Sequence, residues 1–420
     1  MSMKSDRNKD MILGAAGDAL LRVCAAPDDN HEGAFTRLDA DGWDWLARTA
    51  CTQRIAPVLG RALRKADVDG RVPAAAADRI ASVARWHALY ALRQGAAIVD
   101  TLKLLRSEGF APLVLKGGAL AWRDYPDPVL RPMRDADLLL GREEAVAAQE
   151  MLLAHRAYRL VPHSVHYGPE HTHQLPPVQE IDRGLTIEIH HRLNAQGWAH
   201  EGQLLAMMRR ANESINLLGI PARVPTAHVN LLHLIEHATL HHAFENGPLI
   251  LSDVHYIAAN HAIDWRKLET DATRMGLANG LYLIVALALQ HGARWVPSSL
   301  ARAATAAAPH LSAARMALLS DPETRSRHAM LRRLEREVGH QPGWTDGLMR
   351  ALRPDNLQLA RMSGFGSEQS LRWVGYPRWL VNRGVRFWSA RRGEDTAPVV
   401  EKQLAMAEWL SAPDIADRGS

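Results

Sequence analysis

The sequence predicts an α+β protein in which a central α/β module is flanked by helical regions on both sides along the chain. In residues 11–108, and again after Pro225, apolar residues recur three and four positions apart, which is the spacing of one helix face. Between these regions, short runs of branched residues alternate with helical patterns. The 420-residue chain therefore divides into an expected helical region at 1–110, an α/β module at 111–222 and a second helical region at 223–420.

Individual elements follow from the same patterns and from the residues that end them. The N-terminal region should contain a long helix at 75–107, preceded by breaks at 27–30 and 67–73, where proline, aspartate and asparagine or glycine gather. In the middle part we expect one helix, at 142–155. We also expect four short strands, at 111–115, 135–140, 171–175 and 185–191.

The C-terminal part reads as helical almost to its end. Asn246, Pro297 and Gly343 mark expected boundaries between helices, because these residues favour turns. A last short helix is expected at 400–410, and the chain shows no internal repeat.

Composition restricts the class of protein. Hydrophobic residues make up 47% and charged residues 23%, as in soluble globular proteins, and the formal net charge of +4 points to no particular partner. Cys24 and Cys51 are too few for a disulfide framework or a cysteine zinc site, so both are expected to be reduced. Asp18 and Arg22 interrupt the first apolar run, and the run at 281–289 is about half a membrane span. We therefore expect a cytoplasmic protein without a membrane partner.

Two aspartates on one predicted strand are the first sign of chemistry. Because strand side chains alternate between faces, Asp135 and Asp137 should point the same way, while Ala136 and Leu138 point into the core. Like charges this close repel and raise one another's pKa unless a cation lies between them. Mg²⁺, which prefers carboxylate oxygens, water and substrate phosphates, is the natural cation for such a pair.

Glu188 is the candidate for a third carboxylate. In its predicted strand, Ile187 and Ile189 take one face and leave Glu188 and His190 on the other. If this strand neighbours that of Asp135, three carboxylates can hold two metal ions about 3.5 to 4 Å apart, the arrangement for in-line phosphoryl transfer. The alternative is a solvated strand edge, the commoner role of an Asp-x-Asp pair taken alone.

Basic and glycine residues near the aspartates are candidates for binding a nucleotide. Lys116, Gly117 and Gly118 combine a cation with a backbone that can approach a phosphate closely, although an ordinary strand-to-helix turn has the same pattern. Arg131 and Arg134 lie just upstream of the aspartates. They can clamp phosphates bidentately or simply balance the acidic strand.

Read as one unit, residues 113–140 resemble the signature of the uncharacterised nucleotidyltransferase family, which is related to the DNA polymerase beta superfamily. The unit combines an apolar strand, Lys116-Gly117, Tyr125-Pro126, Arg131-Pro132-Met133, and Asp135 with Asp137 followed by aliphatic residues. The run from Glu188 to Arg192 resembles the family's second signature, and the run from Arg54 to Leu59 its N-terminal helical region. The resemblance covers roughly residues 43–257.

The resemblance implies a small mixed-sheet palm, two Mg²⁺ ions and an NTP such as ATP as donor. Asp135, Asp137 and Glu188 would be the metal-binding catalytic residues. Lys116, Gly117 and Gly118 would face the β- and γ-phosphates, with Arg131, Arg134 and His190 as further candidates for contacting the nucleotide. The superfamily's usual Gly-Ser turn is replaced here by Lys-Gly-Gly, and the third carboxylate is Glu rather than Asp.

The acceptor is left open by this resemblance. A hydroxyl or phosphate of a small molecule or peptide is favoured, in peptide tailoring or surface polysaccharide metabolism. RNA or tRNA, as in a toxin-like transferase, is the alternative, and a non-catalytic nucleotide-binding module is a third hypothesis.

Histidines form the remaining clusters. His233, His237 and His241 recur every four residues and would form a stripe on one helix. Such a stripe can bind a metal, can contact phosphate in the wall of the active-site cleft, or can simply be buried. His173 and His190 are expected to face the cleft and His171 to lie in a turn.

Two further features carry open alternatives. Asp253 either pairs with a nearby His or Arg or caps a helix N-terminus. Arginines at 325–336 and 378–392 are interleaved with Trp373, Trp379, Phe387 and Trp388. This region is either a nucleic-acid surface or, as we favour, a set of amphipathic helices with buried aromatics and solvated arginines.

Overall fold

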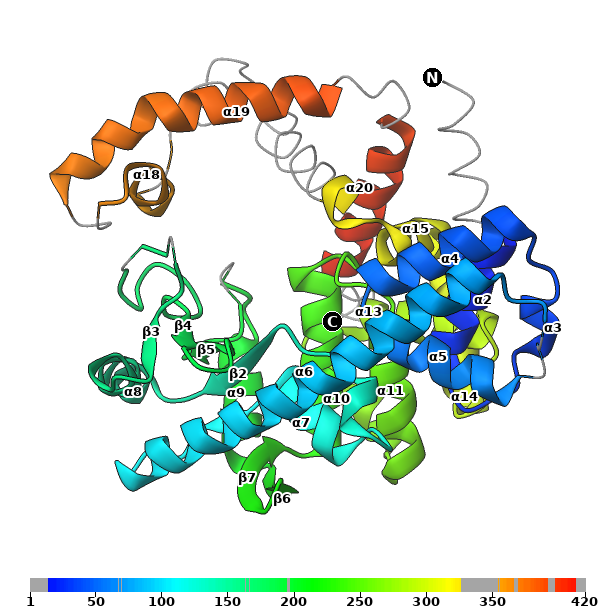
Figure 1. Ribbon diagram of the computed structural model, residues 1–420, viewed down its shortest axis with the longest axis horizontal. Coiled ribbons are helices and arrows are strands. Elements are labelled where there is room, and N and C mark those ends of the chain that lie inside the picture. The colour runs from blue at the N-terminus through cyan, green and yellow to red at the C-terminus, as the bar shows by residue number, and fades with distance from the viewer. Residues whose placement is uncertain are drawn as a thin grey trace, which may run out of the picture.

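The computed structural model describes residues 14–66, 68, 70–162, 164–165, 167–194, 197–325, 354, 356–365, 369–391 and 397–412 (Figure 1). The N-terminal region is helical, as predicted. Its helices are α2 (Ala15–Ala25), α3 (Glu32–Phe35), α4 (Ala40–Thr52), α5 (Ala56–Lys65) and α6 (Ala74–Ser107).

Local sequence explains where these helices begin. The Asp39 side chain accepts a hydrogen bond from the Gly42 N–H and so caps α4. Pro57 lies in the first turn of α5, where its missing N–H costs nothing. The predicted helix at 75–107 is confirmed, because α6 runs unbroken over Ala74–Ser107.

The middle of the chain forms a seven-stranded sheet of order β3-β4-β5-β2-β1-β7-β6. The pairs β2 with β5 and β1 with β7 are parallel and the other pairs are antiparallel, so the sheet is mixed, as the α+β expectation requires. The strands are β1 (Leu113–Val114), β2 (Asp135–Leu139), β3 (Tyr158–Leu160), β4 (Val178–Glu180), β5 (Thr186–His190), β6 (Asn212–Leu217) and β7 (Ile220–Pro225). Helices α7 (Lys116–Arg123), α8 (Arg142–Ala154) and α9 (Glu201–Arg210) and the 3-10 turn η1 (Pro128–Leu130) connect them.

Three of the four predicted strands are confirmed as β1, β2 and β5, and the predicted helix at 142–155 as α8. The strand predicted at 171–175 is wrong, because only Gln174 forms an isolated bridge, to His190. Pro176 and Pro177 follow at once and cannot donate to a ladder.

The hairpin of β6 and β7 was not predicted. Its two-residue turn, Leu218 and Gly219, has positive φ at both positions, 49° and 89°. That geometry usually selects Asn-Gly, and Leu at the first position hides the hairpin from sequence analysis.

After β7 the described chain is helical again. The predicted boundaries at Asn246 and Pro297 lie between helices, the predicted helix at 400–410 lies in α20, and Gly343 falls outside the described residues. The elements are α10 (Ala227–Glu236), the π-helical turn η2 (His237–His241), α11 (Leu249–Asn260), α12 (Trp265–Arg274), α13 (Ala278–Gln290), α14 (Ser298–Ala303), η3 (Ala304–His310), α15 (Leu311–Leu319), α18 (Asn356–Ser363), η4 (Ser370–Gly375), α19 (Tyr376–Arg391) and α20 (Ala397–Ser411).

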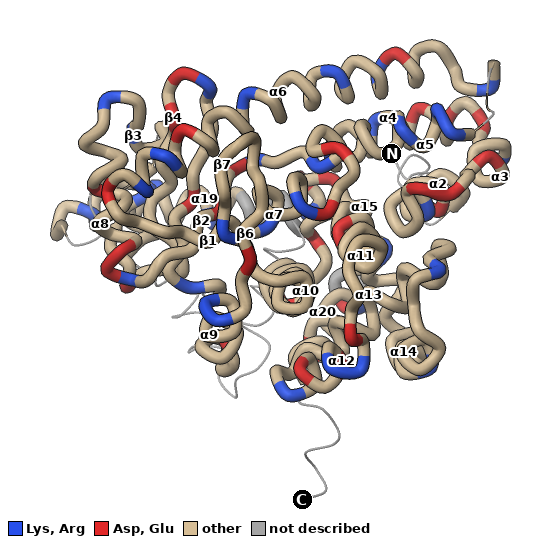
Figure 2. Tube along the Cα trace, turned by 90° about the horizontal axis from the view of Figure 1, so that it is seen from below, with Lys and Arg blue, Asp and Glu red and all other residues tan. Residues whose placement is uncertain are grey.

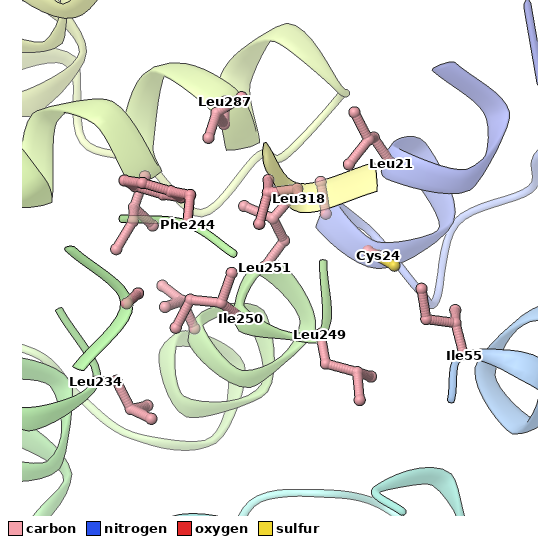
Figure 3. Close-up of a cluster of buried hydrophobic side chains, with 14 of the residues drawn as sticks. Leu21, Cys24, Ile55, Leu234, Phe244, Leu249, Ile250, Leu251, Leu287 and Leu318 are labelled. Carbon is pink, nitrogen blue, oxygen red and sulfur yellow. The ribbon is translucent and has the colours of Figure 1, made fainter. Parts of the chain in front are cut away.

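The helices before and after the sheet share one hydrophobic core. Figure 3 shows Leu21 and Ile55, from the N-terminal part, in the same cluster of buried side chains as Leu251 and Leu318 from the C-terminal helices. Polar contacts join the same parts, since Arg315 Nη2 lies 2.6 Å from Asp18 Oδ1. The two helical regions, far apart in sequence, therefore build a single support.

A second core lies between the sheet and the helices α6 and α8. Helix α6 belongs to both cores: Ala76 and Ile80 contribute to the first, and Ile98 and Leu102 to the second. This long helix thus ties the sheet to the helical support (Figure 1).

In the view of Figure 2, basic and acidic residues are interspersed along the described chain. In the basic C-terminal region Trp379 is buried, with the Arg383 guanidinium 5.3 Å from its ring centre, whereas Trp373 is half exposed. Residues 326–336 and the side chains of Phe387 and Trp388 fall outside the described part. Among the described helices, none is both long and apolar enough to cross a membrane.

Candidate active site

Strands β2 and β5 bring the predicted carboxylates together. They pair in parallel, with Asp135 opposite Thr186 and Asp137 opposite Glu188. Ala136 and Leu138, which alternate with the aspartates, are buried in the core beneath the sheet, so the carboxylates share the other face. The expectation that the two acidic strands are neighbours is therefore confirmed.

Asp137 is almost fully buried and is held by Lys116 and His190. Lys116 Nζ lies 2.7 Å and His190 Nε2 2.9 Å from its Oδ1 atom, and His190 Nε2 is also 3.6 Å from Glu188 Oε2. Burial alone would raise the pKa of Asp137, but Lys116 and the hydrogen bond from His190 outweigh it and hold that pKa below its ordinary value. Asp137 is consequently a fixed negative charge.

Asp135 is in the opposite situation. It forms no ion pair with any other described residue, and burial, together with the charges of Asp137 and Glu188, raises its pKa to about 7. Two neighbouring carboxylates on one strand thus have pKa values shifted in opposite directions. The uncompensated negative charge of this face is concentrated at Asp135.

Lys116 begins α7 with φ of +45°, a left-handed conformation that non-glycine residues rarely adopt. The Leu115 N–H donates to the Asp137 carbonyl at 3.0 Å, which places Lys116 beside the carboxylates. Strain of this kind persists where surrounding structure enforces it, and functional sites are where it gathers. Lys116, chosen from sequence as a phosphate ligand, contacts Asp137 directly.

Gly117 and Gly118 are required by packing. A Cβ on Gly117 would lie 2.8 Å from Met133 Cγ, and one on Gly118 would lie 2.7 Å from Val114 Cγ1. Both distances are far shorter than a normal carbon–carbon contact of about 3.5 to 4.0 Å. The glycines let α7 pack closely against β1 and against the segment that leads into β2.

We expect Gly118→Ala to destabilise the protein by about 2 kcal/mol, because Val114 is a buried, β-branched strand residue that cannot move aside. Gly117→Ala should destabilise the protein less, since the flexible Met133 side chain can adopt another rotamer. Urea unfolding of both variants measures the difference. The double variant Gly118→Ala, Val114→Ala should recover part of the loss, and no recovery would exclude this contact as the cause.

Arg131 is held by Asp253 from the C-terminal helical region. Its Nε and Nη2 atoms lie 2.6 and 2.9 Å from the two carboxylate oxygens, and the Tyr125 hydroxyl donates to Oδ1 at 2.6 Å. Asp253 therefore pairs with an arginine, and the helix-cap alternative is wrong because Pro248 occupies the N-cap of α11. Arg134, by contrast, is exposed beside Asp135.

The histidines form a row that leads away from the carboxylates. Ring centres are 5.4 Å apart for His190 and His173, 5.2 Å for His173 and His241, and 5.4 Å for His241 and His237. His242 Nε2 lies 3.2 Å from His237 Nε2. The π-helical turn makes this cluster possible, because the extra residue per turn brings His242 next to His237.

Most of this row is uncharged at neutral pH. Burial, reinforced by nearby positive groups, lowers the pKa of His173 and His242 to about 3 and that of His237 well below its ordinary value. His233 continues the stripe and is buried, whereas His171 contacts Glu170 in a bend, as expected for a turn residue. His237, His241 and His242 have ring nitrogens close enough together to hold a metal ion.

A family comparison identifies the class of protein. The model of a family described as uncharacterised nucleotidyltransferase matches residues 39–291, more than half of the chain. The chain belongs to this family. The match includes the complete sheet, α7 and the histidine row, and it extends beyond the 43–257 expected from sequence motifs. Searches of curated proteins and of solved structures return no match.

Membership of a nucleotidyltransferase family supports nucleotidyl transfer as the general activity and a nucleotide as substrate. Sequence reasoning missed two residues that lie close enough to Lys116 for its charge to act on them. His242 was overlooked because a regular helix would turn it away from His237, and only the doublet at 241–242 hinted at it. Glu236, fully buried with Oε1 2.7 Å from Asn194 Nδ2, was also missed.

Proposed function

We propose that this nucleotidyltransferase is magnesium-dependent and transfers a nucleoside monophosphate from an NTP donor, with Asp135, Asp137 and Glu188 as the metal-binding catalytic residues. The single observation that supports this best is the register of β2 and β5, which aligns Asp137 with Glu188 and leaves Asp135 on the same face. The two-metal arrangement of such enzymes needs this set of carboxylates on neighbouring strands.

The donor set fits magnesium. All three candidate ligands are carboxylates, and burial followed by the charges of Asp137 and Glu188 raises the pKa of Asp135, a repulsion that a bound cation would relieve. Bound magnesium would lower the pKa of an acceptor hydroxyl and neutralise charge on the leaving pyrophosphate. Lys116 and His190 position Asp137 from the protein side, which fixes one ligand before any ion binds.

The remaining candidates act on the nucleotide in this proposal. Lys116 and the backbone N–H groups at Gly117 and Gly118, at the start of α7, favour negative charge. Arg131 is oriented by Asp253, and Arg134 lies exposed at the edge of the acidic face. His190 forms a hydrogen bond to Asp137, so we assign it a positioning role.

For the acceptor we propose a hydroxyl or phosphate of a small molecule or peptide. Along the described chain in Figure 2, basic residues are interspersed with acidic ones, which favours a small acceptor over a long nucleic acid. An RNA acceptor remains the second hypothesis, tied to the basic C-terminal region. It predicts binding that weakens steeply with salt.

The decisive experiment incubates the protein with each α-³²P-labelled NTP, magnesium and a cell extract. We expect label on a peptide or metabolite with the wild type, and none with the double variant Asp135→Asn, Asp137→Asn. Label on RNA would support the second hypothesis. Equal labelling by both proteins would remove these aspartates from the mechanism, and absence of NTP binding by the wild type would favour a non-catalytic module.

A further inference from the structure

Three arginines from separate parts of the chain lie near the acidic face. Arg54 follows α4, Arg134 precedes β2, and Arg325 lies beyond α15. They are close enough for the charge of Arg134 to act on both Arg54 and Arg325, and Asp135 acts on Arg54. None of the three forms an ion pair with another residue that the structure describes. We call Arg54, Arg134 and Arg325 the arginine cluster.

The backbone at Arg54 is unusual. Helix α4 ends in a Schellman motif, in which the Arg54 N–H donates to the Cys51 carbonyl at 3.2 Å and the Ile55 N–H to the Ala50 carbonyl at 2.7 Å. This motif needs a left-handed residue, normally glycine, and Arg54 has φ of +61°. An arginine therefore stands where the fold favours glycine, which suggests that its side chain serves another purpose.

Gln53 connects Arg54 with Arg325. Its buried side chain donates to the Ser320 carbonyl and accepts from Arg325 Nη2, and the same Nη2 lies 3.1 Å from the Leu318 carbonyl. Arg325 is thus fixed beside the Arg54 turn by hydrogen bonds to uncharged groups. These contacts join the N-terminal helices to the C-terminal ones at one edge of the site.

The charges of the arginine cluster are only partly offset: Asp135 acts on Arg54 and Glu245 on Arg325, but no described carboxylate forms an ion pair with any of the three arginines. Burial, and after it the charge of Arg134, lowers the pKa of Arg54 to about 10. Arg131, by contrast, forms an ion pair with the carboxylate of Asp253. Three guanidinium groups held near one another without a paired carboxylate repel, so this arrangement favours a ligand with several negative charges.

The neighbouring histidines fit the same ligand. The positive charge of Lys116 acts on the imidazoles of His237, His241 and His242. A transition metal bound by these three histidines would therefore lie close to the Lys116 charge. Arg134 and Arg325 act in the same way on His242. This surrounding positive charge disfavours a metal cation and favours an anion, which neutral imidazoles can assist with their N–H groups.

We propose that Arg54, Arg134 and Arg325 bind the β- and γ-phosphates of the nucleoside triphosphate donor. The inference rests on the proposed function, because the reacting α-phosphate must lie at the carboxylates and the rest of the triphosphate beside them. It assigns the phosphate tail to residues outside the sheet. Both helical regions then contribute directly to the substrate site, and a donor that lacks the tail binds poorly.

Arg54→Gly tests the proposal with a variant that should remain folded, so a loss of binding cannot be attributed to unfolding. Glycine suits the left-handed position, so the thermal midpoint should equal or exceed that of the wild type. Affinity for inorganic tripolyphosphate, measured by titration calorimetry on the full chain with magnesium and again with EDTA, should fall about tenfold to a hundredfold. Arg54→Lys, which keeps the positive charge, should retain part of the affinity.

Leu218→Gly is the matched control, because Leu218 is also left-handed but lies in the β6–β7 turn. It should leave tripolyphosphate affinity unchanged. If Arg54→Gly and the wild type bind tripolyphosphate equally, or if neither binds it, the inference is overturned whatever the enzyme activity. If affinity falls as expected but no NTP labels an acceptor, the phosphate site stands and the proposed reaction fails.

Arg325→Met and Arg134→Gln extend the test to the other two arginines. Each should weaken tripolyphosphate binding while leaving the affinity for AMP within about twofold, since AMP has no phosphate tail. The exposed Arg209→Gln in α9 is the control for a general loss of positive charge. Equal weakening of AMP and tripolyphosphate would assign these arginines to the nucleoside or α-phosphate and overturn the inference.

Discussion

Asp135→Asn and Asp137→Asn should both reduce nucleotidyl transfer by at least about a thousandfold, because each removes a proposed metal ligand. Their effects on stability should differ in sign. Without magnesium, Asp135 carries an uncompensated charge, whereas Asp137 is the partner of Lys116 and His190. Single variants measured in EDTA therefore separate two carboxylates that turnover alone cannot distinguish.

For Asp135 the sign follows from its raised pKa. A carboxyl with a pKa of about 7 in the folded protein and near 4 in the unfolded chain binds more protons when folded, so stability falls as pH rises between these values. Asp135→Asn removes this pH-dependent loss of stability. We expect no change at about pH 4 and a gain of about 2 kcal/mol in the free energy of unfolding at about pH 8.

For Asp137 the loss should be about 3 kcal/mol at neutral pH, because a buried Lys116 is left without its closest carboxylate. Chemical denaturation of both variants over a pH series, with EDTA, supplies the measurement. Destabilisation by Asp135→Asn, or stabilisation by Asp137→Asn, would contradict the charge distribution described for the site. With magnesium present, the gain from Asp135→Asn should shrink, since the ion offsets the same charge.

Asp253→Ala should lower the free energy of unfolding by about 3 to 5 kcal/mol, one of the largest single effects in the molecule. The substitution leaves the Arg131 guanidinium buried without its carboxylate and removes the acceptor of the Tyr125 hydroxyl. Because Arg131 precedes β2 and Asp253 belongs to α11, it also loosens the contact between the sheet and the helical support. Turnover should therefore fall as well, without loss of the metal ligands.

A double-mutant cycle tests this assignment. Replacing both partners, as Arg131→Met with Asp253→Leu, should recover much of the stability, because the isolated buried charge is gone. Asp44→Ala is the control, since its pairs with Arg48 and Arg79 are exposed and the loss should be less than about 1 kcal/mol. Additive losses at Arg131 and Asp253 would show that the pair does not act as a unit.

Sequence periodicity determined the local structure well. Alternation predicted β2 and β5 with their carboxylates on one face, and α6 is placed within one residue of its predicted start. These predictions succeed because each depends only on residues a few positions apart. The hairpin of β6 and β7 failed for the same reason, since Leu218 breaks the local rule for its turn.

By itself, the sequence determined the fold class, the family and the acidic strands, because these are encoded in motifs and in the local spacing of apolar residues. Only the tertiary structure decided which charges meet. In the structure, Lys116 pairs with Asp137 and Arg131 pairs with Asp253. Arg54 and Asp135 form no ion pair with another described residue. Charge pairing depends on distances between residues far apart in the chain and on burial, which weakens solvent screening. Neither these distances nor burial can be predicted from a local sequence pattern.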